Sequence, residues 1–144
     1  MMYSFGKIST ERLKTIHPIG QLILNDAIKV VDFSIICGLR NEQDQNEAFR
    51  NNKSTKQFPD SRHNKTNDPQ FELIKHDISD AWDIAPWPTL YSNEKYILIV
   101  AGVIKACAER YSVKLRWGGD WNGNGKLNDS NSDLYDPWHF EIVW

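Results

Sequence analysis

The sequence has little cysteine and no long apolar run. Its two cysteines, Cys37 and Cys107, fall in a predicted strand and a predicted helix, so we expect buried free thiols and not a zinc site built from thiolates. The apolar stretches are too short to span a bilayer, so we expect no membrane partner. Residues 1–7 lack the apolar core of a signal peptide, and we expect the protein to be made and kept in a cytoplasm.

An excess of charge of either sign is also missing. The chain has 17 Lys and Arg residues against 19 Asp and Glu residues, which gives a net charge of -2. This balance offers no electrostatic reason to bind nucleic acid. The length of 144 residues suits one domain with a real core, so we expect residues 1–144 to form a single domain that acts as a monomer.

The chemically informative side chains are concentrated in residues 134–144. Alternation of apolar and polar residues predicts a strand there, and its apolar face comprises Trp138, Phe140 and Ile142. His139 and Glu141 occupy the other face, and Asp136 precedes His139 by three residues. A histidine held on a strand beside a carboxylate suits a catalytic zinc site. The alternative is a partly buried histidine bonded to a neighbouring carboxylate.

Two upstream motifs, S-x-H and A-x-D-x-x-P, offer further metal ligands. Catalytic zinc sites take three protein ligands and leave a fourth position open for water. His63, Asp83 and His139 would supply such a set. Trp82 and Ile84 flank Asp83 in the same alternation, which would turn the carboxylate towards the site and its neighbours towards the core.

Taken in order, these motifs resemble a known family. The segments at 61–63, 81–86 and 136–141 are similar to motifs of the zinc peptidases of the D-alanyl-D-alanine carboxypeptidase superfamily. In particular, nearly the whole chain resembles the phage endolysins that act as L-alanyl-D-glutamate peptidases. The resemblance implies a catalytic zinc ion, the peptidoglycan stem peptide as substrate, and host cell lysis as the result.

The resemblance leaves two candidates for the first histidine ligand. The family has a short loop between this histidine and the aspartate, whereas His63 lies far from Asp83 in the sequence. His76 is nearer, but it lacks the preceding serine and lies in a polar, charged stretch. We favour His63, which carries the S-R-H-N signature. We interpret residues 65–78 as an insertion, since a longer loop costs little closure entropy.

The resemblance also assigns roles to side chains beside the ligands. Arg40 matches an arginine that binds and polarises the substrate, since a guanidinium can hold a carboxylate or an oxyanion; the alternative is an ordinary surface arginine. Asp136 is expected to move protons as the general base. We expect Ser61 to bond a carboxylate or backbone group near the metal. Glu141 either orients His139 or is exposed on the strand.

The periodicity of the chain predicts an α+β domain. Helices are expected over residues 18–31, 41–50 and 96–111, the second capped by Asn41 and the third opened by Ser92 or Asn93. Strands are expected over residues 33–39, 113–117 and 138–144. We therefore expect a small antiparallel sheet with helices packed on one face and a single zinc site on the open face.

A separate segment rich in Gly and Asn, residues 120–131, is similar to a calcium-binding loop. Its oxygen ligands would come from Asp120, Asn122, Asn124, Lys126 and Asp129. The closing Glu of an EF-hand is missing, since Asn131 holds that place, so we expect weak binding that responds to millimolar calcium. The alternative is a plain turn of residues that tolerate positive φ. The resemblance favours calcium, because some relatives carry a similar loop and respond to the ion.

Three functions fit these observations. The first is a zinc endopeptidase that hydrolyses the L-alanyl-D-glutamate bond of the stem peptide. The second is a D-alanyl-D-alanine carboxypeptidase, which shares the metal site, and the third is a non-catalytic, metal-stabilised module that binds cell wall. The presence of Asp136 and Arg40 favours an enzyme. We expect this enzyme in the host bacterial cytoplasm, from which it would reach the periplasmic cell wall after the membrane is permeabilised.

Overall fold

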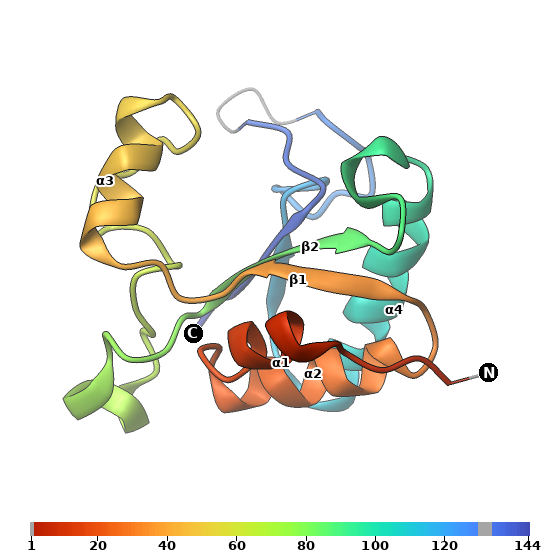
Figure 1. The fold of residues 1–144 in the computed structure, drawn as a ribbon, viewed down its shortest axis with the longest axis horizontal. Helices are drawn as coiled ribbons and strands as arrows, with labels where there is room; N and C mark the ends of the chain where they lie inside the picture. The colour runs from red at the N-terminus through yellow and green to blue at the C-terminus, as the bar shows by residue number, and fades with distance from the viewer. Residues whose placement is uncertain (1, 130–133) are drawn as a thin grey trace.

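A four-stranded antiparallel sheet organises the structure, a computed structural model that describes residues 2–129 and 134–144. The strands are β1 (Phe33–Cys37), β2 (Ala81–Pro86), β3 (Leu115–Trp117) and β4 (His139–Ile142). Their order in the sheet is β1-β2-β4-β3, so the last strand of the chain lies inside the sheet (Figure 1). Three strands fall within their predicted ranges but are shorter. The alternation around Asp83 belongs to β2, one of the two central strands.

Helices cover one side of this sheet. They are α1 (Lys7–Leu13), α2 (Pro18–Ile28) and α4 (Tyr96–Arg110), whereas α3 (Glu42–Arg50) stands apart from them (Figure 1). Two short 3-10 helices, η1 (Pro69–Ile74) and η2 (Leu90–Ser92), lie in the connections. The predicted α+β class, with an antiparallel sheet and helices on one face, is confirmed. Helix α1 was not predicted, because its only buried side chains are Ser9 and Leu13 and they form no apolar stripe.

The helix ends follow from their capping residues. Pro18 lies in the first turn of α2, where its missing N–H costs nothing. The predicted cap of α3 is confirmed, since the Asn41 side chain accepts a hydrogen bond from the Asp44 N–H at 2.8 Å. Helix α4 begins at Tyr96, whose N–H donates to the Asn93 side chain at 3.0 Å. Asn93 therefore supplies a hydrogen bond to the start of this helix, as predicted, although the residue at the cap position is Lys95.

The core lies between the sheet and the helices. Trp82 and Phe140 are fully buried, and their rings stack with centroids 6.3 Å apart. On the helix side, α2 approaches Trp82 so closely that a Cβ on Gly20 would come within 2.9 Å of the indole ring. A glycine is therefore required at this crossing. Burial of these aromatic and aliphatic side chains is the main source of stability. Because side chains alternate along each strand, it also turns the polar side chains to the opposite face of the sheet.

The segment expected as an insertion forms a closed loop beside the sheet. The Thr66 N–H donates to the Lys75 carbonyl at 2.8 Å, which joins its two ends. Within it, the Asp68 side chain caps η1 and accepts a hydrogen bond from the buried His17 ring at 2.8 Å. The loop is thus anchored to the start of α2. Over residues 2–129 and 134–144, none of the helices has the length and apolar character needed to cross a membrane.

Candidate functional site

Cross-strand pairs bring the candidate side chains to one face of the sheet. Cys37 of β1 pairs with Asp83 of β2, and Asp83 pairs with His139 of β4. Glu141, two residues further along β4, pairs with Arg116 of β3. Because side chains alternate along a strand, this row projects away from the apolar core. The register of the sheet therefore assembles a polar site from all four strands.

Three metal-ligating atoms converge at the centre of this row. The Oδ1 atom of Asp83 lies 3.1 Å from His139 Nδ1 and 3.3 Å from His63 Nε2. The two ring nitrogens are themselves 3.3 Å apart. Two imidazoles and one carboxylate that face one point form the donor set of an open zinc site with three protein ligands. The residues present therefore fit the metal that the resemblance implies.

Contacts on the outer sides of the two rings fix their orientation. The Nδ1–H of His63 donates to the Gly38 carbonyl at 2.8 Å, which directs Nε2 towards Asp83. The Nε2–H of His139 donates to Glu141 at 3.2 Å, which directs Nδ1 towards the same point. Such contacts set the tautomer of a ligating histidine and raise its basicity. Of the two roles considered for Glu141, its 7 % exposure and this contact fit orientation of His139.

The electrostatics of the three donors favour a positive charge between them. Burial by itself lowers the pKa of His63, but the adjacent Asp83 carboxylate outweighs it and raises that pKa. Burial raises the pKa of Asp83, yet the charge of His63 and the hydrogen bonds from both rings hold it below its ordinary range. A carboxylate that stays ionised in a buried cluster stabilises a cation, and a divalent metal ion would supply that charge.

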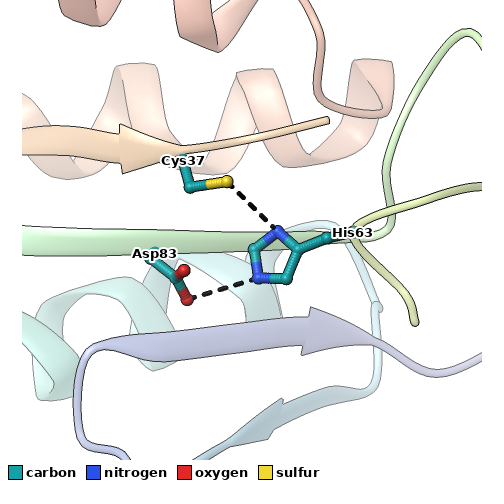
Figure 2. A group of neighbouring side chains, drawn as sticks. All are labelled: Cys37, His63 and Asp83. Carbon is teal, nitrogen blue, oxygen red and sulfur yellow. Dashed lines mark hydrogen bonds and ion pairs between the residues drawn. The ribbon is translucent and has the colours of Figure 1, made fainter. Parts of the chain in front are cut away.

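Cys37 lies next to this centre and was not predicted to do so. Figure 2 shows its side chain directed at the ring of His63, with Sγ 3.8 Å from Nδ1. The thiol is partly exposed, in contrast to the buried thiol that the sequence analysis expects, whereas Cys107 is buried as expected. Burial raises the pKa of the Cys37 thiol, but the hydrogen bond to His63 and the charges of His63 and Arg40 together outweigh this effect and lower it. The end of a strand beside Gly38 was the only sequence signal for this position.

Arg40 reaches the centre from the segment after β1. Its Nη2 lies 3.6 Å from Asp83 Oδ2, the carboxylate oxygen that the histidines do not share. Its Nη1 donates to the Gln45 side chain at 3.0 Å. Gln45 is fully buried on α3 and was not recognised in the sequence, because a polar residue in a polar helix gives no signal. The guanidinium is thus held beside the candidate metal ligands.

Asp136 lies beside the same centre. Single oxygen or nitrogen atoms of Asp83, Asp136 and His139 all lie within 4.8 Å of one another. One Asp136 oxygen accepts the Trp138 N–H at 3.2 Å, and its backbone N–H donates to the Gly118 carbonyl at 2.9 Å. Burial, followed by the nearby Asp83 charge, raises the pKa of Asp136. A carboxylate with a raised pKa beside a metal site is a stronger base than a free aspartate.

The two remaining candidates near the first motif differ in position. Ser61 Oγ accepts the backbone N–H of His63 at 3.2 Å, so the serine shapes the turn that presents the ligand. His76 is exposed, and its Nδ1 lies 3.3 Å from the Asn64 carbonyl, with its ring packed on Phe58. The structure therefore brings His63, and not His76, to Asp83 and His139.

An open cleft with a volume of about 350 Å³ runs over these residues. Its floor holds the three candidate ligands together with Arg40, Asp136 and Glu141. Residues 52–56, which follow α3, line one wall, and Arg116 and Trp121 also line the cleft. This space can admit an extended peptide to the candidate metal centre.

The candidate calcium loop leads from β3 towards this cleft. The Asp120 carboxylate accepts the N–H groups of Asn124 and Gly125, at 3.2 and 2.9 Å. Asp129 accepts hydrogen bonds from the side chains of Asn122 and Asn124, at 3.1 and 2.6 Å. The four predicted side-chain ligands are therefore linked by hydrogen bonds within one turn. Lys126, whose carbonyl is the fifth candidate, follows Gly125, while Asn131 lies outside the described residues.

Trp121 connects this loop to the candidate metal centre. Its indole ring lies 5.4 Å from the His139 ring, centroid to centroid. Its Nε1–H donates to the Leu134 carbonyl at 2.6 Å, which ties the loop to the segment that leads into β4. Trp121 therefore contacts both the segment before β4 and a candidate zinc ligand.

Comparisons with known proteins place the chain among cell-wall peptidases. The sequence model of the family described as phage L-alanyl-D-glutamate peptidase matches residues 1–143. The L-alanyl-D-glutamate peptidase of Escherichia phage T5 is 27% identical over 149 residues, which cover 99% of this chain and 100% of that protein. The crystal structure of the Serratia marcescens L-Ala D-Glu endopeptidase ChiX superposes with a TM-score of 0.69 and 24% identity, over 94% of this chain and 86% of that one.

Proposed function

The chain belongs to the phage L-alanyl-D-glutamate peptidase family, and from this premise we propose that it is a zinc endopeptidase that hydrolyses the L-alanyl-D-glutamate bond of the peptidoglycan stem peptide. One observation supports the zinc site above all others. His63, Asp83 and His139 present three donor atoms that are 3.1 to 3.3 Å apart, although the residues come from a loop and two strands. Such convergence of one buried and two partly buried donors is costly unless they share a cation.

Each side chain around this centre has a chemical task in peptide hydrolysis. When bound, zinc would polarise the scissile carbonyl and lower the pKa of a water molecule. Asp136 would take a proton from the attacking water and deliver it to the leaving amine. Arg40 would donate to the oxygen of the scissile carbonyl as negative charge develops there, since Gln45 holds the guanidinium in place. Glu141 would keep His139 oriented throughout.

We propose calcium as a regulator of this activity. The ligands would be the side chains of Asp120, Asn122, Asn124 and Asp129 together with the Lys126 carbonyl. With two carboxylates the site would be weak and would fill only at millimolar calcium. Binding would steady Trp121 against His139 and so favour the active arrangement, which is a population shift by differential binding. The enzyme would then be sluggish in a calcium-poor cytoplasm and active at the wall.

The same family supports the proposed substrate and its location. We propose that the protein is made in the host cytoplasm and reaches the peptidoglycan after the membrane is permeabilised. A wall-binding module without catalysis would have no use for Arg40 and Asp136 beside the candidate ligands. A carboxypeptidase would release only the terminal residue of a stem peptide, so the released fragments distinguish the two reactions.

Mass spectrometry of purified peptidoglycan after digestion tests this proposal. We expect fragments with a new amino terminus at glutamate, and glycan strands that retain only alanine on the lactyl group. Asp136→Asn protein should release neither. Release of free D-alanine alone would assign the chain to the carboxypeptidase reaction, and intact peptidoglycan with bound protein would assign it to a binding role.

A further inference from the structure

The cleft carries positive charge, part of which the proposed chemistry does not use. The cleft is lined by the cations Arg40, Lys53, Lys56, Arg62 and Arg116. Arg40 is close to Asp83, and Arg62 forms a 2.5 Å ion pair with Glu141. Arg116 lies only 4.0 Å from the same, already paired Glu141 oxygen, and its side chain is 41% exposed. Lys53 and Lys56 take part in none of the ion pairs found over residues 2–129 and 134–144.

The two lysines stand on a turn that the protein holds in place. The buried Gln45 side chain donates to the Lys56 carbonyl at 2.6 Å and to Ser54 Oγ at 2.9 Å. The Lys53 N–H donates to the Ala48 carbonyl at 2.8 Å, which fixes the other end of the turn to α3. Gln45 Oε1 also accepts a hydrogen bond from the Arg40 guanidinium. One buried amide therefore sets the position of the lysine turn relative to the candidate catalytic centre.

The proposed substrate has an anionic group that such cations can bind. A glutamate residue has two carboxyl groups, and only one of them can continue the peptide chain. The residue on the amine side of the scissile bond therefore keeps a free carboxylate within a few bonds of the reacting atoms. Ammonium groups carried by a fixed turn can pair with this carboxylate, at the cost of ordering their exposed side chains.

We propose that the turn over residues 52–56, through Lys53 and Lys56, is a specificity site that binds the free carboxylate of the glutamate beside the scissile bond. Arg116, which also lines the cleft, adds to the attraction for an acidic peptide. This inference rests on the proposed function and adds to it the group by which the substrate is selected. It accounts for two lysines that line the cleft of a chain whose overall charge is -2.

Steady-state kinetics on two matched substrates test the inference. The first is the soluble disaccharide-peptide released from peptidoglycan by a muramidase, with its glutamate carboxylate free. The second is the same compound with that carboxylate converted to a primary amide. For the wild type, we expect KM to be about five- to tenfold higher for the amide, the size expected for two partly exposed ion pairs, with kcat changed less than about twofold.

Variants locate the effect on the turn. Lys53→Gln combined with Lys56→Gln should raise KM for the acidic substrate by about the same factor and leave KM for the amide unchanged. Lys14→Gln combined with Lys95→Gln, which removes the same charge from exposed positions outside the cleft, should leave both values unchanged. Thermal unfolding of each variant shows whether the fold is retained.

Three results would overturn the inference. The first is a wild type that cleaves both substrates with equal KM. The second is a cleft variant whose KM rises equally for both substrates. The third is a control variant whose KM for the acidic substrate rises as much as that of the cleft variant. A wild type that cleaves neither substrate, while zinc is bound, would instead overturn the proposed function and the inference with it.

Discussion

At the scale of single residues, the candidate centre has each donor held by a second contact. Gly38 fixes the ring of His63, Glu141 fixes that of His139, and Arg40 lies beside the second oxygen of Asp83. Donors that are already oriented lose little conformational freedom when a metal binds. The protein therefore presents a preorganised site whose individual ligands can be tested one at a time.

The choice between two histidines gives the first test. His63→Ala should abolish zinc content and lytic activity, because it removes one of three converging donors. His76→Ala should leave both nearly intact, since the exposed His76 ring lies against Phe58 and the Asn64 carbonyl and does not line the cleft. Metal analysis of the two purified variants, alongside lysis assays, checks this. The reverse pattern would transfer the ligand role to His76.

The general base gives the second test. Asp136→Asn should keep the zinc and the fold but lower kcat by about two orders of magnitude or more, as expected for loss of a positioned base. The amide can still accept the Trp138 N–H, so the segment before β4 should keep its shape. Zinc content and single-turnover rates are the measurements. Zinc loss, or near-normal turnover, would remove Asp136 from this role.

Alternation or a motif marks several residues that the structure brings together. His63, Asp83, His139 and Asp136 are predicted in this way and meet in one cleft. Cys37 and Gln45 were missed for a physical reason. Their places depend on how the segment after β1 folds back over the sheet and on where α3 stands, which are tertiary contacts without a local signal.

At the scale of elements, periodicity predicts the interior of each helix and strand better than its ends. The helix expected over 96–111 spans Tyr96–Arg110, whereas the strand expected over 138–144 spans only His139–Ile142. Each short strand ends where its hydrogen-bonded pairing with a neighbouring strand ends. The local sequence does not identify that neighbouring strand. Helix α1 was missed because its burial is shared with neighbours that are distant in sequence, such as β1.

Substitutions in the candidate calcium loop test a prediction about this element. Asp129→Asn keeps the size of the side chain but removes one of two carboxylates, so calcium affinity should fall by about tenfold or more. Asp120→Ala should lower lytic activity in calcium-containing buffer yet leave zinc bound, because its oxygens hold the loop and not the zinc centre. Calorimetric titration with calcium and lysis assays with and without a calcium chelator are the measurements. Activity that is indifferent to both the chelator and the Asp120 change would reduce the loop to a plain turn.

At the scale of the whole molecule, the sheet separates the apolar core on one face from the candidate site on the other. Helices α1, α2 and α4 lie on one side of the sheet, where the apolar core is buried (Figure 1). The polar row and the cleft lie on the other face. The insertion of β4 between β2 and β3 carries His139 from the end of the chain to the middle of the sheet. Sequence reasoning predicted which residues face the site, but this topology brings them together.

The central claim is that His63, Asp83 and His139 hold one catalytic zinc ion. Anomalous diffraction at the zinc absorption edge, from crystals of the protein purified without chelator, tests this claim most directly. We predict a single strong peak in the cleft, about 2.0–2.2 Å from His63 Nε2, His139 Nδ1 and an Asp83 oxygen. A peak bound by Cys37 with His139 left out, a peak at His76, or zinc-free protein with full lytic activity would contradict the account.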